Sequence, residues 1–104
     1  MSKLENIGLY IESYEPTPRD RKSFYGKAIV ERFTDGFILR SYNTEVLAYK
    51  KSTGEYYRLW QDWSATTGRH IASVSGLNKA EFCKLAIARH EGNGDLIIKD
   101  EAEA

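Results

Sequence analysis

The chain has 104 residues and a mass of 11.9 kDa, which is enough for one domain with a small core. Apolar residues make up 41% and charged residues 29%, a balance typical of globular domains and not of disordered chains. No apolar run is long enough to cross a bilayer, and the start M-S-K-L-E-N lacks a signal-peptide core, so we expect a cytoplasmic protein with no membrane partner. The single cysteine, Cys83, allows no internal disulfide, which fits a reducing compartment.

Net charge is zero, but the charges are unevenly distributed along the chain. Residues 19–69 carry ten basic and six acidic side chains, a surplus of +4, and the segments on either side are acidic. A basic surplus can attract nucleic-acid phosphates, although this one is small and also fits an ordinary solvated surface.

Strands are predicted through the first half of the chain. Residues 7–14 have strand-like composition and end at Pro16 and Pro18, which force an extended turn. Two hairpins follow, with turns at T-D-G and at K-S-T-G, because glycine and aspartate tolerate the positive φ that such turns need. Asn43 turns the chain between the hairpins. The predicted strands of this four-stranded antiparallel meander are residues 28–33, 37–42, 45–50 and 55–60.

A first helix is predicted to begin after Ser64, whose side chain suits an N-cap. Ala65, Ile71 and Val74 then fall near one helical face. Gly68 lies inside this pattern and costs ~1 kcal/mol relative to alanine. We therefore expect either a close approach to its backbone or a weak helix.

A second helix is predicted from the capping-box pair Asn78 and Glu81 through F-C-K-L-A-I-A-R-H. It would place Cys83 on its buried face as a small apolar residue, and His90 in its last turn before a stop at Gly92.

Strands followed by helices predict an α+β fold. We expect a single domain over residues 1–104, with the four-stranded meander covered on one face by two helices. Residues 7–14 and 96–99 offer a further strand at either end, and residues 100–104 form a frayed acidic tail.

Three motifs carry a resemblance: S-F-Y-G-K-A (23–28), S-Y-N-T-E-V (41–46) and S-A-T-T-x-R-H-I (64–71). In this order they resemble a family of small proteins from bacteriophages and mobile elements of Gram-positive bacteria, a family with no established activity. The resemblance covers roughly residues 23 to 74. It implies a phage-type accessory protein acting in the host cytoplasm, a class rich in small binders that modify host processes.

The sequence contains no recognisable catalytic arrangement. It lacks a nucleophile–base pattern, the H-E-x-x-H metal motif and a glycine-rich phosphate loop. His70 and His90 are far apart in the chain and belong to no metal-binding spacing. We therefore expect a protein that is not an enzyme and uses no metal or cofactor, unless distant residues converge in space.

Hydroxyl and cationic residues gather at the start of the first predicted helix, where free backbone amides can hold an anion. An alternative is purely structural, with one hydroxyl capping the helix, others bonding to nearby backbone and the histidine packed under the sheet. The candidate anion-binding residues are Ser64, Thr66, Thr67, Arg69 and His70.

A second candidate site is one face of the predicted meander. Period-two alternation places aromatic and arginine side chains together there, while the opposite face packs against the helices. Such a face suits a protein interface or the stacking of single-stranded bases, and also an ordinary half-buried strand surface. The candidate contact residues are Arg40, Tyr42, Tyr49, Tyr56, Arg58 and Trp60.

Three functions follow in order of preference. The first is binding of a host protein, to inhibit or modify it, since the whole chain is neutral. The second is binding of single-stranded nucleic acid by the same face, helped by Lys27 and Arg69. The third is a phosphate or small-ligand site at the helix start. An exposed aromatic face would also favour self-association as a homodimer.

Overall fold

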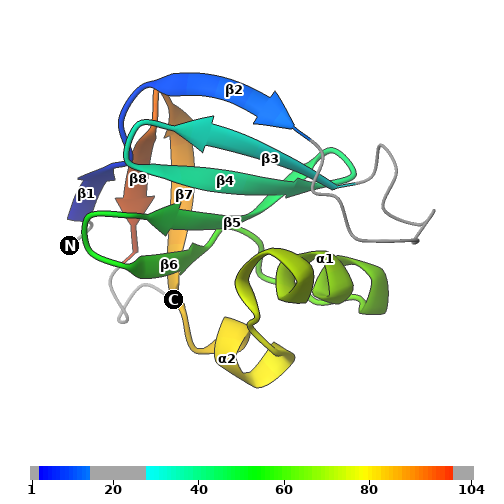
Figure 1. Ribbon diagram of the computed structural model, residues 1–104. Helices are drawn as coiled ribbons and strands as arrows, with labels where there is room; N and C mark the ends of the chain where they lie inside the picture. Colours follow the sequence, from blue (N-terminus) through cyan, green and yellow to red (C-terminus); the bar gives the residue numbers. More distant parts are fainter. Residues whose placement is uncertain (1–2, 15–27, 100–104) are drawn as a thin grey trace.

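The structure is a computed structural model, and it describes residues 3–14 and 28–99 (Figure 1). Within these residues there are eight strands and two helices. They are β1 (Lys3–Asn6), β2 (Tyr10–Tyr14), β3 (Ala28–Phe33), β4 (Gly36–Ser41), β5 (Thr44–Lys50), β6 (Glu55–Arg58), α1 (Ala65–Ser75), α2 (Lys79–Cys83), β7 (Ala86–Gly92) and β8 (Asp95–Ile98). The predicted turn at residues 15–18, Lys27 and the tail at residues 100–104 lie outside the described residues.

The predicted meander is present as β3 to β6, with each strand antiparallel to the next. It forms only half of the sheet. All eight strands belong to one sheet in the order β1-β8-β7-β6-β5-β4-β3-β2, and the single parallel pair among them is β6 with β7. The α+β class is therefore confirmed, while the expectation of a four-stranded sheet was wrong.

The two strands at the ends of the sheet order, β1 and β2, are consecutive in the chain, so the sheet must curve to bring them near each other. Only residues 7–9 join β1 to β2, so these strands must lie near each other at one end. Ile7 bridges two turns there: its N–H donates to the Gly94 carbonyl at 2.9 Å and its carbonyl accepts from the Asp35 N–H at 2.8 Å. Gly8 has φ +91° and a Cβ there would lie 1.8 Å from Thr34 Oγ1, so only glycine fits this crossing.

The prediction of a long second helix was wrong, because most of this segment forms a strand. The capping box of Asn78 and Glu81 forms, but α2 ends at Cys83 and the chain continues as β7. Pairing with β6 on one side and β8 on the other outweighs the helical propensity of this alanine-containing segment. His90 consequently lies on a strand, and Cys83 is exposed instead of buried.

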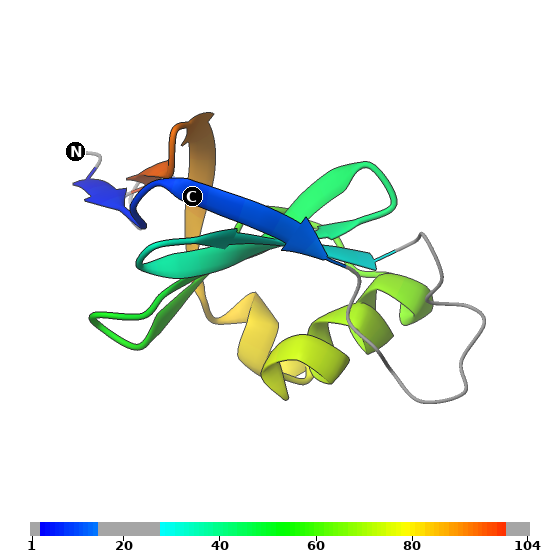
Figure 2. The ribbon, with the colours of Figure 1, turned by 45° about the horizontal axis from the view of Figure 1, so that its top comes forward.

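Helices α1 and α2 both lie on one side of the sheet (Figure 2). Apolar side chains gather in two clusters, one on each sheet face. The cluster under the helices is Ala28, Val30, Leu39, Val46, Leu47, Ile71 and Phe82. The cluster on the opposite face is Ile7, Phe33, Ile38, Ala48, Tyr57, Ala88, Leu96 and Ile98. Among the described helices none is long and apolar enough to cross a membrane.

Tyr57, in the second of these clusters, makes stability depend on alkaline pH. Burial first, and the nearby Glu55 carboxylate second, raise the pKa of its phenol from 10.0 to about 12. Since the native state favours the neutral phenol, this contribution to the unfolding free energy is complete below pH 10 and is lost as pH rises toward 12. We expect urea titrations to show this alkaline decline in the wild type and a shallower one in Tyr57→Phe. An equally steep decline in both proteins would contradict the assignment.

Candidate functional site

Three aromatic rings from neighbouring strands lie in contact on the helix-bearing side of the sheet. Register places Phe37 of β4 opposite Tyr49 of β5, and Tyr49 opposite Tyr56 of β6. Their ring centroids are 5.3 Å apart for Phe37 and Tyr49 and 4.6 Å for Tyr49 and Tyr56. All three side chains are half-buried. Burial, with Tyr49 as a second cause, raises the pKa of Tyr56, so its phenol stays a neutral hydrogen-bonding group.

A hollow of about 210 Å³ extends from these rings to strand β2. We call it the aromatic hollow; its lining includes Ile11, Tyr14, Arg32, Phe37, Tyr49 and Lys51. Phe37 and Tyr49 line it from β4 and β5, Ile11 and Tyr14 come from β2, and Arg32 and Lys51 add positive charge.

Strand β2 is the last strand in the sheet order, and within the described residues no other strand pairs with its outer edge. All five of its residues are exposed. Leu9, just before the strand, is 72% exposed, and Tyr10, Ile11 and Tyr14 are 53%, 51% and 46% exposed. Large apolar side chains beside unpaired backbone groups are typical of an edge that accepts another chain.

The six residues predicted to share one sheet face do not lie together. Tyr49, Tyr56 and Arg58 do share one face, but it is the helix-bearing face and not the face opposite the helices that was predicted for them, whereas Arg40 belongs to the other face. The cause is a β-bulge: Arg40 pairs with Glu45 while Leu39 pairs with Leu47, so one residue of β5 has no counterpart on β4. This extra residue reverses the expected alternation between β4 and β5.

Two of the predicted contact residues help to hold the helices. The guanidinium of Arg58 lies 5.3 Å from the centre of the Phe82 ring, and its Nε donates to the Trp60 carbonyl at 2.9 Å. Trp60 itself packs against the cluster under the helices. Arg40 lies near Glu31 on the opposite face, and Tyr42 is half-exposed in the β4–β5 turn. Only Tyr49 and Tyr56 therefore contribute to the aromatic cluster beside the hollow.

The residues at the start of α1 also separate. Ser64 is the N-cap, as predicted, and its side chain accepts from the Thr67 N–H at 3.2 Å. Thr67 and His70 point inward, where the Ser41 hydroxyl lies 3.0 Å from Thr67 Oγ1 and 2.8 Å from His70 Nδ1. This buried hydrogen-bonded group ties α1 to β4.

Thr66 is half-buried and Arg69 is exposed, away from the buried hydrogen-bonded group. The five predicted anion-binding residues thus form no common surface, and a ligand at the helix start stays a prediction. Two motifs of the sequence, S-Y-N-T and S-A-T-T-x-R-H, meet at this buried contact between Ser41 and His70.

Two features of the candidate surface, the exposed strand β2 and Phe37 in the aromatic hollow, were not identified from the sequence. Strand β2 was expected only as an extra strand, and its sequence, with apolar or aromatic residues at 9, 10, 11 and 14, follows no alternation that would mark one buried face. Phe37 was not among the candidate contact residues, but it pairs with Tyr49 and lines the aromatic hollow. The described residues contain no cluster of histidine, cysteine or acidic side chains suited to a metal ion.

The fold and this surface define a small α+β domain with an apolar edge strand beside an aromatic hollow. A family model matches residues 13–89, and the chain belongs to that family, described as a family of unknown function (DUF8033). Comparisons with curated proteins and with solved structures gave no significant match. The family match establishes kinship over most of the chain and carries no activity with it.

Proposed function

We propose that the protein is a non-enzymatic accessory protein of a bacteriophage or mobile element, and that it binds a host protein through strand β2 and the aromatic hollow. One observation carries the proposal: the exposed apolar side chains of Leu9, Tyr10, Ile11 and Tyr14 on an edge of the sheet. Phage origin rests on the sequence motifs that resemble proteins of phages and mobile elements.

The chemistry of the surface favours an extended segment of a protein. Such a segment can add to β2 through backbone hydrogen bonds, while alternate side chains enter the aromatic hollow. Tyrosine, phenylalanine and arginine are enriched at protein interfaces, and apolar side chains such as Ile11 gain free energy when a partner removes them from water. Glu12 lies 3.4 Å from Arg32, so part of the positive charge beside the hollow is already compensated.

Single-stranded nucleic acid is the second candidate, and one observation favours it. The rings of Phe37, Tyr49 and Tyr56 form a stack to which Arg32 and Lys51 add positive charge, as on surfaces where bases stack and cations contact phosphates. With either partner, a host protein or single-stranded nucleic acid, the proposal places the protein in the host cytoplasm.

The double variant Ile11→Ser/Tyr14→Ser is expected to lose partner binding by at least about tenfold, because it removes two apolar anchors. Both side chains are about half exposed, so folding should be little affected. Leu4→Ser is the matched control, since Leu4 is 63% exposed on the other edge strand, β1. Immobilised proteins are incubated with a Gram-positive lysate, and each bound protein is quantified by mass spectrometry.

A partner retained by wild type and Leu4→Ser but lost by the double variant supports the proposal. A partner captured equally by all three proteins shows that binding occurs elsewhere. The solution mass of each protein is measured in parallel, because a dimer that the double variant abolishes would make a second copy the occupant of β2. Salt-sensitive binding of a labelled single-stranded oligonucleotide in fluorescence anisotropy, with no protein captured, would instead favour the nucleic-acid candidate.

A further inference from the structure

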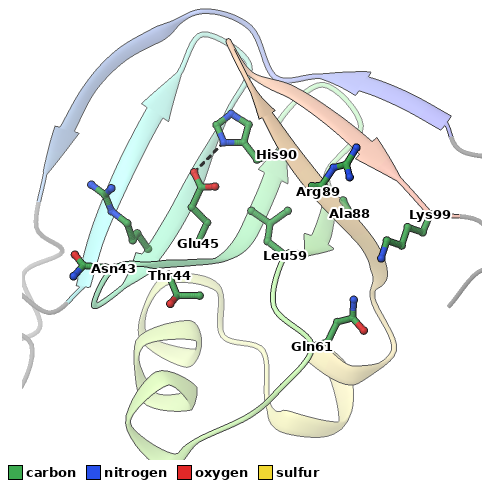
Figure 3. Close-up of a pocket in the computed structure, with 10 residues that line it drawn as sticks. Asn43, Thr44, Glu45, Leu59, Gln61, Ala88, Arg89, His90 and Lys99 are labelled. Carbon is green, nitrogen blue, oxygen red and sulfur yellow. Dashed lines mark hydrogen bonds and ion pairs between the residues drawn. The ribbon is translucent and has the colours of Figure 1, made fainter.

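A second hollow, larger and more polar, lies on the sheet face that is not covered by the helices. This polar cavity has a volume of about 560 Å³, within the ~300–1,000 Å³ typical of small-molecule sites. It forms where the β4–β5 turn, the segment after β6 and strand β7 meet (Figure 3). Leu59 and Ala88 give it a small apolar base, and the other lining residues are polar or charged.

Positive charge exceeds negative charge in the polar cavity. Its described lining contains Arg40, Arg89 and Lys99 but only one carboxylate, that of Glu45. Arg89 also contacts Glu91, which compensates part of its charge. Within residues 3–14 and 28–99, no carboxylate lies within ion-pair distance of Lys99, so its ammonium group is available to an anionic ligand.

The carboxylate in the polar cavity is held by a neighbour. His90 Nδ1 and Glu45 Oε2 lie 2.9 Å apart, and this hydrogen bond joins β7 to β5 across the cavity wall (Figure 3). It orients the Glu45 carboxylate toward His90.

Two polar atoms of lining residues lack hydrogen bonds. Arg40 Nε and His90 Nε2 are both buried and have no hydrogen-bond partner among the described residues, although Arg40 Nε lies 4.0 Å from a Glu31 oxygen. A buried donor or acceptor without a partner costs ~1–3 kcal/mol, so such groups mark places where a ligand or ordered water completes the structure.

From these observations we infer that the polar cavity binds a small phosphorylated, hydroxyl-rich molecule of sugar-phosphate size. Figure 3 shows Lys99 and Gln61 on one side of the cavity and Asn43 and Thr44 on the other. Lys99 binds the phosphate, and the amide and hydroxyl groups of Asn43, Thr44 and Gln61 bind hydroxyls.

A nucleobase fits the polar cavity less well than a sugar. The described lining contains no phenylalanine, tyrosine or tryptophan on which a base could stack, in contrast to the aromatic hollow. The two sites lie on opposite faces and use different residues, so this inference is independent of the proposed protein partner.

The experiment is a titration of the full chain with ribose 5-phosphate, followed by isothermal calorimetry and amide NMR shifts at fixed ionic strength. Ribose and inorganic phosphate are titrated separately. We expect ribose 5-phosphate to bind more tightly than either, and to shift the amides of Thr44, Glu45 and His90. Lys99→Gln should weaken binding by at least about tenfold, because it removes the charge that meets the phosphate.

Two further variants make the result specific. Lys84→Gln, at an exposed lysine beside α2, is the matched control and should bind like wild type. Thr44→Val should weaken ribose 5-phosphate while leaving inorganic phosphate unchanged. Thermal unfolding of each variant excludes loss of fold as the cause.

Three outcomes would overturn the inference: no binding of ribose 5-phosphate, binding that Lys99→Gln leaves unchanged, or equal affinity for inorganic phosphate. The last would show a simple anion site without recognition of hydroxyls.

Discussion

Phe82→Ala is expected to lower the free energy of unfolding by about 3–5 kcal/mol, a large share of the ~5–15 kcal/mol typical of a folded domain. Phe82 is fully buried, and its ring lies 5.5 Å from that of Trp63. Truncation would leave a cavity between α2 and the sheet and remove the ring over which Arg58 lies.

Helix α2 depends on this one side chain. It has only five residues, too few for a stable helix in isolation, and Phe82 is its only buried residue. The neighbouring Cys83 is exposed, so Cys83→Ala is the matched control and should change stability by no more than ~0.5 kcal/mol. Urea unfolding measured by circular dichroism gives both values. A loss below about 1 kcal/mol for Phe82→Ala would mean that α2 does not anchor through this ring.

The middle of the fold was predictable because its signals are local. Hairpin turns at T-D-G and at Gly54, the Ser64 cap and the capping box of Asn78 with Glu81 are each decided by residues within a few positions of one another. These elements form as expected.

The C-terminal hairpin of β7 and β8 has a local sequence signal, but the segment was predicted as a helix. Asn93 and Gly94 have φ values of 54° and 76° in the tight turn between β7 and β8, and an Asn-Gly pair between two apolar segments is a strong hairpin signal. The helix start capped by Asn78, however, suggested a helix that continued to Gly92. What ends the helix early is pairing with β8 through this hairpin and with β6, and since β6 lies almost thirty residues earlier in the chain, local propensity could not reveal that second pairing.

The candidate sites were harder to predict than the fold. The bulge between β4 and β5 reverses which residues share a face, and nothing in the local sequence marks it. The polar cavity unites residues from Arg40 to Lys99, whose proximity depends on the whole curved sheet. Two side chains that the sequence suggested for binding, Arg58 and Trp60, pack against Phe82 and the cluster under the helices.

Gly68→Ala is expected to destabilise the protein, although helix propensity alone predicts a gain of ~1 kcal/mol. Gly68 is buried inside α1, and a Cβ there would lie 2.4 Å from Cζ2 and 2.8 Å from Cε2 of Trp63. The ring cannot move away freely, because it packs against Phe82. Such overpacking costs ~1–3 kcal/mol, so we expect the clash to outweigh the propensity and unfolding to become easier by up to about 2 kcal/mol.

The cause can be isolated with a double-mutant cycle. Trp63→Leu lowers stability by itself, but it removes the ring atoms that a Cβ at residue 68 would meet. In that background Gly68→Ala should become neutral or stabilising, since only the propensity effect remains. The sign of the Gly68→Ala effect, measured by urea unfolding with and without Trp63, is therefore the decisive quantity. If alanine stabilises the protein with Trp63 present, the indole does not lie against the helix backbone, and the glycine serves the helix in some other way.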